Sequence, residues 1–580
     1  MSVSSWVKVP VGPHAPRWST RRPLRTVLIV VHTLTAWNRL ADILPIFDSD
    51  DRVQLVFTFP AASAVDSDVA SHLARAGAAT IPWSQAVNTG FDLAISVHHS
   101  GDLHELNAPL VLLSHGIGYT KHTRNRGIEE SRNRGIEESR NRGIEESRNR
   151  GIEESRNSPV YGLSPEWLTR HGSVVASALV LSHDEQYERL AATTPEAVSA
   201  AVVGGDPCLD RMRASMGRRP RYRRALGADP GSRIVAVSST WGDTSLFGRD
   251  PDLLADLLAE LPDDHVVAAI FHPNTWYAHG PWQLRCWLGR CLRAGLRLVP
   301  PDAGWQQALI AADAVVGDHG AVTAYAAALG KPVLLGAFPD ADVAAGSAVA
   351  ALGGIAPRLD RRRSLAAQLH ELTATPPDLR EVGELASSVP GESAGILRRV
   401  CYELMKLDEP GEPALVAPYP ESGLVPEHEP VRAWWVTGER TGSDVRLIRW
   451  PGDVQPDRGR DTVPPGRHLV VAVDHPRHDL RGAASILVHD LHDADDPDQL
   501  LAETLRAHPA CAIAAAAGPG ECRVLLRDGR RFTASVPPDT VDPAMCASAV
   551  RCWADAAPPA EFGLAVGTRT ARVSLRSADH

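Results

Sequence analysis

Residues 314–323 read Ala-Val-Val-Gly-Asp-His-Gly-Ala-Val-Thr. The apolar start of this stretch predicts a short buried strand, the two glycines predict a tight turn, and the small residues from Ala321 to Leu329 predict a helix. The first N–H groups of such a helix have no partner inside it, and the helix dipole places partial positive charge there. The stretch therefore predicts a phosphate-binding site that needs no metal.

The candidate phosphate-binding residues fall at this turn and at the end of one earlier strand. At the turn they are Asp318, His319, Gly320, Ala321, Val322 and Thr323, and at the earlier strand end they are Ser239 and Thr240. Small hydroxyl groups can donate hydrogen bonds to phosphate oxygens. Capping of the helix is the structural alternative for Asp318.

The same alternation of apolar runs and helical patterns continues on both sides of the turn. The runs predicted as further strands are Thr26–Val31, Val53–Phe57, Phe91–Ser96, Pro109–Leu113, Ser177–Ser182, Ala200–Val203, Ile234–Thr240, Val266–Phe271, Leu296–Val299 and Val333–Leu335. The helical patterns between them include Ala36–Leu44, Ser67–Ala76, Asp252–Leu261, Gly280–Ala294 and Trp305–Ala311. This alternation is typical of βαβ units and a mostly parallel sheet. We therefore expect an α/β fold with two Rossmann-like lobes that face a cleft.

Changes in composition divide the chain. The predicted parts are a disordered N-terminus at 1–24, a first Rossmann-like lobe at 25–212, a second, nucleotide- and phosphate-binding lobe at 213–407, a linker rich in Pro, Glu and Gly at 408–430, and an accessory domain at 431–580. A helix over Glu392–Met405 is expected to close the second lobe. The accessory domain shows both strand and helix patterns, so we expect a smaller α/β or α+β domain, and its role is open.

An exact repeat interrupts the first lobe. The octapeptide Arg124–Ser131 occurs four times, so the insertion spans 124–155. Each copy carries two Arg, two Glu and a single Ile, which cannot build a core. We expect a solvated loop or a frayed helix, and a variable lid over the cleft is the alternative.

Composition narrows the class of protein. Of the 580 residues, 44% are apolar and 22% are charged, which is typical of a soluble globular protein. The formal net charge of −10 argues against a general nucleic-acid binder. The eight cysteines form no C-x-x-C pair and no zinc-like spacing, which favours reduced thiols in a cytoplasmic protein. No apolar run reaches the length of about 18 residues that a membrane span needs.

Ligands of parallel α/β sheets bind at the carboxyl ends of the strands, and the segment Ser114–Lys121 directly follows one. His115 is a candidate general base, because the pKa of histidine lies near neutrality. Gly116 and Gly118 let the backbone turn close to a ligand, and Lys121 can pair with a phosphate. A turn with a hydrogen-bonded histidine is the structural alternative.

Two strand ends in the second lobe carry further candidates. Trp241 follows one strand and can stack on a base or pack in the core. His272 ends the next strand and is followed by Pro273, which restricts it to an extended conformation. A buried structural histidine is the alternative at this position.

Taken in order, these segments resemble the motifs of the CDP-glycerol glycerophosphotransferase family, the teichoic-acid polymerase type, which has a GT-B fold. The matching positions are His115, Gly116 and Lys121, then Gly205, Asp206, Pro207 and Asp210, then Thr240, Trp241 and Asp243, then His272 and Pro273, and finally Gly317–Ala321. Gly320 and Ala321 stand where that family has paired serines, so contacts to phosphate shift towards backbone amides. Gly242 stands where a basic residue is expected, so a nucleotide-sugar donor is also consistent.

The resemblance implies a GT-B-like transferase that acts in cell-envelope polymer synthesis. It would move a polyol phosphate or a sugar from a CDP- or UDP-linked donor to a hydroxyl acceptor, with no further cofactor. His115 and His272 would be catalytic, and Gly205–Asp210 would lie in the cleft. The hydroxyl acceptors of such enzymes include membrane-associated molecules. We therefore expect the protein in the cytoplasm or at the inner face of the membrane. A non-catalytic nucleotide-sugar-binding or scaffold protein and a UDP-GlcNAc 2-epimerase-like enzyme are the alternatives, and the oligomeric state is open.

Overall fold

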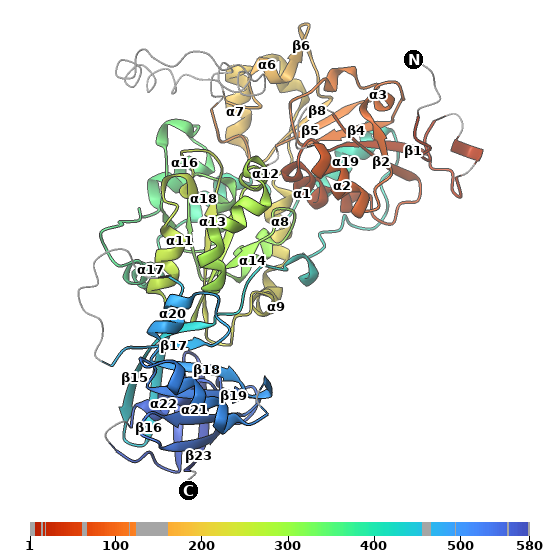
Figure 1. The fold of residues 1–580 in the computed structure, drawn as a ribbon. Helices are drawn as coiled ribbons and strands as arrows, with labels where there is room; N and C mark the ends of the chain where they lie inside the picture. The colour runs from red at the N-terminus through yellow and green to blue at the C-terminus, as the bar shows by residue number, and fades with distance from the viewer. Residues whose placement is uncertain are drawn as a thin grey trace, which may run out of the picture.

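A seven-stranded parallel sheet forms the first lobe in the computed structural model of the chain (Figure 1). In sheet order its strands are β3 (Thr80–Pro82), β2 (Val53–Phe59), β1 (Arg25–Val30), β4 (Leu93–Ser96), β5 (Leu110–Leu113), β8 (Ala178–Leu181) and β9 (Ala201–Val203). Strands β4, β5 and β8 are buried along their whole length. Helices cover both faces of a parallel sheet, so its inner strands are buried on both sides. This burial explains why their sequences are continuous apolar runs.

A five-stranded parallel sheet forms the second lobe. In sheet order its strands are β12 (Arg297–Val299), β11 (His265–Phe271), β10 (Arg233–Ser239), β13 (Ala314–Gly317) and β14 (Val333–Leu335). In both sheets the first strand of the lobe lies inside the sheet and the chain winds outwards to either side of it. This order is the doubly wound, Rossmann-like arrangement. The predicted α/β fold with two Rossmann-like lobes is confirmed.

Helices flank both sheets. Those of the first lobe are α1 (Leu34–Ile43), α2 (Asp66–Arg75), α3 (Trp83–Ala86), α6 (Pro165–Leu168) and α7 (Asp184–Thr193), with a hairpin of β6 (Thr169–Arg170) and β7 (Ser173–Val174). Those that follow are α8 (Pro207–Ala214), α9 (Arg219–Ala225), α10 (Leu246–Arg249), α11 (Leu253–Glu260), α12 (Pro273–His279), α13 (Pro281–Arg293), α14 (Trp305–Ala311), α15 (Ala321–Ala328), α16 (Ala348–Ile355), α17 (Leu365–Ala374) and α18 (Arg380–Ala386).

Helix α19 (Ser393–Met405) returns to the first lobe (Figure 1), where it contacts β4 and the short 3-10 helix Leu44–Phe47. The sequence predicts that this helix closes the second lobe. Instead, its buried residues Leu397 and Tyr402 share a core with Val27 and Ile29 of β1. The chain therefore crosses between the lobes before α8, again before α19, and a third time after α19, where the predicted linker leads back to the second lobe.

The C-terminal domain is a closed barrel of nine strands. In order around the barrel these are β15 (Ala433–Thr441), β16 (Asp444–Pro451), β22 (Glu561–Val566), β23 (Arg569–Ser577), β21 (Arg531–Ser535), β20 (Glu521–Leu526), β19 (Ile513–Gly518), β18 (Ile486–Asp490) and β17 (His468–Ala472). Its helices are α20 (His478–Ala483), α21 (Pro497–Ala507) and α22 (Met545–Arg551). Helix α22 shares the core of the strands. The sequence predicts the mixture of strands and helices but not the closure of the sheet.

Residues of the predicted disordered N-terminus and of the predicted linker pack against the two lobes. Gln85 exchanges two hydrogen bonds of 2.9 and 3.0 Å with the backbone of Val7, and Val9 is buried in the first lobe. In the predicted linker, Tyr419 and Leu424 are buried in the core of the second lobe. The structure describes residues 6–12, 15–17, 19–60, 66–114, 116–122, 160–454, 466–493, 495–553 and 556–577. His115 and the repeat at 124–155 lie outside these ranges.

Candidate functional site

The candidates of the second lobe gather at the carboxyl ends of three adjacent strands. Ser239 ends β10 and pairs in register with Phe271 of β11, so Thr240 and His272 leave the sheet side by side. The N–H of His272 donates to the carbonyl of Ser239 over 3.0 Å. Strand β13 pairs with the other side of β10 and brings Asp318 to the same edge.

The Asp318 carboxylate ties two of these loops together. Its Oδ2 accepts the N–H groups of Thr240 and Leu246 over 2.8 and 2.9 Å, and its Oδ1 accepts the N–H of Gly320 over 2.9 Å. The side chain is fully buried. Burial raises the pKa of this carboxyl, while the three amide donors and the positive charge of Lys121 oppose the rise. Asp318 thus shapes the turn in front of α15.

Helix α15 begins at Ala321, and no side chain of the described residues caps it. Ala321 and Val322 are half-buried, and their N–H groups belong to the first turn, which has no intrahelical acceptors for them. Thr323 is fully buried, and its hydroxyl accepts the N–H of Asp318 over 3.2 Å. The ring of His319 is also buried, 6.4 Å from the ring of Phe338. The accessible donors of this turn are therefore backbone amides.

The first lobe reaches the same turn through Gly116 and Lys121. A Cβ on Gly116 would lie 3.4 Å from the Cβ of Ala321, so the backbone that follows His115 passes beside the start of α15. The positive charge of Lys121 acts on the carboxylate of Asp318. We call the region where Gly116 and Lys121 approach Asp318 and Ala321 the interlobe junction.

Backbone pairing fixes Lys121 between the lobes. The N–H of Ala344, from the loop after β14, donates to the carbonyl of Thr120 over 2.9 Å. The N–H of His122 donates to the carbonyl of Asp342 over 3.2 Å. Ala344 is 1% exposed and packs in the core of the first lobe. A second-lobe loop is therefore docked on the first lobe directly beside Lys121.

Two candidates form hydrogen bonds inside their own loops. The carbonyl of Gly118 accepts the hydroxyl of Ser114 over 2.9 Å, and the Gly118 backbone lies against Gln186 of α7 with no room for a side chain. The hydroxyl of Ser239 donates to the next carbonyl over 2.9 Å and accepts the N–H of Phe247 over 3.0 Å. Both residues shape the loops that border the junction.

His272 and Trp241 lie together at the strand ends. The Nδ1 atom of His272 accepts the N–H of Asn274 over 3.1 Å and caps α12, so the neutral ring carries its hydrogen on Nε2. The ring of Trp241 lies 6.4 Å from that of His272 and is 46% exposed. The pair offers a hydrogen-bond donor and an aromatic face at one edge of the sheet.

Gly205 and Pro207 lie where the chain first crosses between the lobes. Gly205 has a φ of +73°, and a Cβ there would lie 2.9 Å from the Cγ2 of Val389. Both the positive φ and the close approach require glycine. Pro207 is the first residue of α8, where its fixed φ suits a helix start.

Asp206 and Asp210 are buried and bonded within the chain. The Asp210 carboxylate accepts the N–H of Gly391 over 2.7 Å and the N–H of Ser393 over 3.2 Å. It thereby ties the first crossing to the second. Asp206 accepts hydrogen bonds from Arg39 of the first lobe and from α15, so this motif joins the lobes to each other.

A group of histidines that is not singled out in the sequence analysis lies at the carboxyl ends of first-lobe strands. His32 follows β1, and His98 and His99 follow β4. The rings of His32 and His98 stack with centroids 4.9 Å apart, and the Tyr119 hydroxyl lies 3.4 Å from Nε2 of His99. The rule that singles out His115, polar residues just past a strand, applies equally to these positions.

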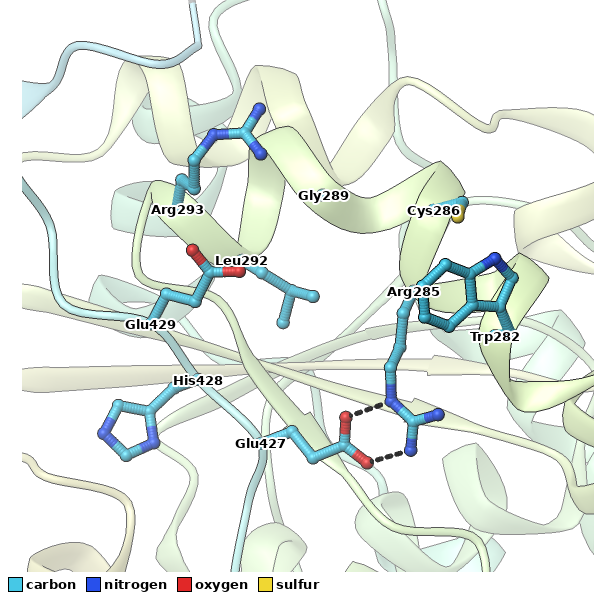
Figure 2. Close-up of a pocket in the computed structure, with 9 residues that line it drawn as sticks. All are labelled: Trp282, Arg285, Cys286, Gly289, Leu292, Arg293, Glu427, His428 and Glu429. Carbon is cyan, nitrogen blue, oxygen red and sulfur yellow. Dashed lines mark hydrogen bonds and ion pairs between the residues drawn. The ribbon is translucent and has the colours of Figure 1, made fainter. Parts of the chain in front are cut away.

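Two hollows lie outside the interlobe junction. One, of about 430 Å³, lies between α13 and residues 427–429 (Figure 2). Arg285 pairs there with Glu427 through bonds of 2.6 and 2.7 Å, and Arg293 and Glu429 also line the hollow. The other, of about 810 Å³, lies at the C-terminal end of α15.

In the part of the chain that the structure describes, no group of three or more His, Cys, Asp or Glu side chains is placed to hold a metal ion. None of the helices seen there combines the length and the apolar composition that crossing a membrane requires.

No family model and no curated protein matches the chain. Among solved structures it is similar to the wall teichoic acid polymerase TagF, with 10% identity over 66% of this chain and 90% of that one and a TM-score of 0.41. It is also similar to Anabaena Alr3699/HepE in complex with UDP and glucose, with 14% identity over 66% of this chain and 100% of that one and a TM-score of 0.35. A third similar structure is UDP-GlcNAc 2-epimerase from Neisseria meningitidis bound to UDP-GlcNAc, with 12% identity over 66% of this chain and 99% of that one and a TM-score of 0.38. At these identities and scores, the likenesses decide neither family, substrate nor reaction.

Proposed function

We propose that the chain is a GT-B-type transferase that moves a polyol phosphate or a sugar from a CDP- or UDP-linked donor to a hydroxyl acceptor. The observation that carries this proposal is the uncapped start of α15, which lies against Gly116 of the first lobe. First-turn N–H groups and the helix dipole suit a phosphate without a metal. Lys121 adds positive charge at the same junction.

In this proposal the donor diphosphate lies at the start of α15, and His272 donates to it from Nε2. Trp241 stacks on the base. His115, which precedes Gly116 in the sequence, takes the proton of the acceptor hydroxyl as that oxygen attacks the transferred group. The bond from that group to the nucleotide breaks, and the amides of α15 together with Lys121 stabilise the negative charge of the leaving nucleotide.

A non-catalytic nucleotide-binding protein is the second candidate. Gly320 and Ala321 supply no hydroxyl at the turn, and the hydroxyl of Thr323 is buried and bonded to the backbone of Asp318. Such a turn can hold a phosphate through amides alone, without the further donors that would favour a transition state over a bound ligand.

Binding and turnover separate the two candidates. Wild type, His115→Ala and a control, His104→Ala at an exposed first-lobe histidine, are unfolded by heat in the presence of CDP, UDP, GDP or ADP. Separate, unheated samples are incubated with CDP-glycerol, UDP-glucose or UDP-GlcNAc, with glycerol or water as the hydroxyl acceptor. The transferase proposal expects a nucleotide to stabilise all three proteins and expects donor consumption by wild type and His104→Ala only.

The remaining outcomes point elsewhere. Nucleotide binding by wild type without consumption of any donor supports the non-catalytic candidate. Isomerisation of UDP-GlcNAc without an acceptor indicates an epimerase. If none of the four nucleotides stabilises wild type, both candidates are wrong.

A further inference from the structure

Tyr325 connects the candidate phosphate-binding helix to the rest of the molecule. It lies four residues after Ala321 on α15, about one turn from the first amides of the helix. Its side chain is 3% exposed, and its hydroxyl donates to Oδ2 of Asp206 over 2.8 Å. Burial raises the pKa of this hydroxyl, so Tyr325 acts as a neutral donor.

The acceptor of that bond belongs to a buried ion pair. Asp206 is fully buried, and Arg39 of α1 donates to both of its carboxylate oxygens, over 2.8 and 3.2 Å. The N–H of Leu209 adds a fourth bond, of 2.8 Å, to the carboxylate. Burial acts to lower the pKa of Arg39, but the pKa is raised overall, and the Asp206 carboxylate is the largest of the causes that raise it. One charge-assisted pair therefore joins the first lobe, the crossing and α15.

The remaining buried contacts of α15 are largely apolar. Five of its eight residues are alanine, and Ala324, Ala326 and Ala327 pack in the core of the second lobe. The helix has no N-terminal side-chain cap among the described residues. The Tyr325 hydroxyl thus supplies a polar contact from α15 towards α1, through Asp206 and through Arg39, which donates to it over 3.4 Å. Breaking it leaves a buried carboxylate with one donor fewer, which is costly.

We propose that Tyr325 is a positioning residue, which acts through Asp206 and Arg39 to set the first amides of α15 against the first lobe. This inference rests on the proposed nucleotide site at the start of α15. The two lobes approach closely there, because a Cβ added to Gly116 would be in van der Waals contact with the Cβ of Ala321, 3.4 Å away. A tilt of α15 by a few tenths of an ångström would change the distance from its amides to a phosphate held between the lobes.

A matched pair of variants tests the proposal in the full chain. Tyr325→Phe removes the hydroxyl of Tyr325 and nothing else. Tyr222→Phe is the control, because Tyr222 is also fully buried and its hydroxyl donates to the carbonyl of Tyr419 over 2.6 Å, away from α15. Thermal unfolding measures the structural cost of each change, and calorimetric titration with CDP and with UDP measures nucleotide affinity.

Both variants are expected to lower the unfolding temperature, because each removes the donor of one buried hydrogen bond. Only Tyr325→Phe is expected to weaken nucleotide binding, by about fivefold or more, whereas Tyr222→Phe stays within about twofold of wild type. Arg39→Lys, which keeps the charge but loses the fork that matches a carboxylate, should weaken binding in the same direction. A variant that carries both Tyr325→Phe and Arg39→Lys should lose less nucleotide affinity than the product of the two single fold-changes, because both changes break one network.

The result that overturns the inference is nucleotide affinity in Tyr325→Phe equal to that of wild type and Tyr222→Phe. This outcome leaves the proposed function intact. If wild type binds neither CDP nor UDP, the proposed function and the inference fail together. If Tyr325→Phe does not fold, Arg39→Lys decides, and unchanged affinity in that variant overturns the inference.

Discussion

A side chain on Gly320 would meet the carboxylate of Asp318, because its Cβ would lie 2.9 Å from Oδ1. The same Cβ would lie 3.3 Å from the Cβ of Thr240. Asp318 cannot give way easily, since three backbone N–H groups hold it. The turn in front of α15 therefore excludes a serine at position 320, whereas Ala321 already carries a Cβ at the next position.

This contrast predicts opposite effects of two serine substitutions. Ala321→Ser adds a hydroxyl at the first position of α15 and is expected to tighten CDP or UDP binding by about two- to fivefold. Gly320→Ser forces Asp318 out of place and is expected to weaken binding and to cost about 1–3 kcal/mol of stability. Calorimetric titration and thermal unfolding measure both. Equal behaviour of the two variants would contradict this account of the turn.

Asp318→Asn tests whether this carboxylate holds the two loops. The substitution places an NH₂ group against backbone N–H donors, and the expected loss of stability is about 2–4 kcal/mol, because buried hydrogen bonds to a charged acceptor are lost. The control is Asp340→Asn, whose side chain is 82% exposed and pairs with Arg358 over 3.5 Å. Urea unfolding should show a change of less than about 0.5 kcal/mol for this control. If Asp318→Asn loses no more stability than Asp340→Asn, the turn does not depend on the Asp318 carboxylate.

The fold could be predicted from the sequence because a buried parallel strand is a continuous apolar run. Thr26–Val31 and Val266–Phe271, for example, are each observed as strands within one residue of the expected ends. Helix α19 shows the limit. Its amphipathic pattern indicates a buried face, but it does not say which of two similar sheets that face covers. Closure of the C-terminal barrel depends in the same way on strand pairing, which local pattern does not contain.

The candidate site could be predicted only in part, because local sequence does not give long-range partners. The segment Gly205–Asp210 was expected to lie in the cleft. Asp206 accepts hydrogen bonds from Arg39, 167 positions earlier, and from Tyr325, 119 positions later, and Asp210 accepts one from Ser393, 183 positions later. The turn at Asp318 was easier to interpret, since a strand end, two glycines and a helix start are neighbours in sequence. His98 and His99 satisfied the same rule and were overlooked.

Gly205, at the first crossing, has two reasons to be glycine: a positive φ and no room for a Cβ. Comparison with two other glycines can distinguish their contributions. Gly205 has both a positive φ and no room for a Cβ, Gly391 has a φ of +88° but open space, and Gly217 has open space and no positive φ. Gly391→Ala is expected to cost about 1–2 kcal/mol, the price of a left-handed conformation for alanine. Gly205→Ala should cost more, because Val389 must also move. Gly217→Ala should be neutral or slightly stabilising.

Thermal and urea unfolding of the three alanine variants check this order. A cost for Gly205→Ala no larger than that for Gly391→Ala would show that Val389 adjusts without strain. Nucleotide affinity provides a second readout, since the first crossing also carries Asp206. Gly205→Ala is expected to weaken CDP or UDP binding, whereas Gly217→Ala leaves it unchanged.

His468 predicts how the C-terminal barrel responds to pH. Its ring is 3% exposed, lies 2.9 Å from the Ser548 hydroxyl and 3.2 Å from the carbonyl of Gly466, and burial lowers its pKa from 6.5 to about 4. Between these two values the unfolded chain binds the proton and the folded barrel does not. This contribution to stability is therefore fully present above about pH 6.5 and is lost as pH falls towards 4, by about 3 kcal/mol in total.

His468→Gln, which does not titrate, should show a flatter decline in unfolding temperature between pH 7 and pH 4. His492→Gln, at an exposed histidine of the same domain, should follow wild type, and a wild-type slope in His468→Gln would assign the acid sensitivity to other groups.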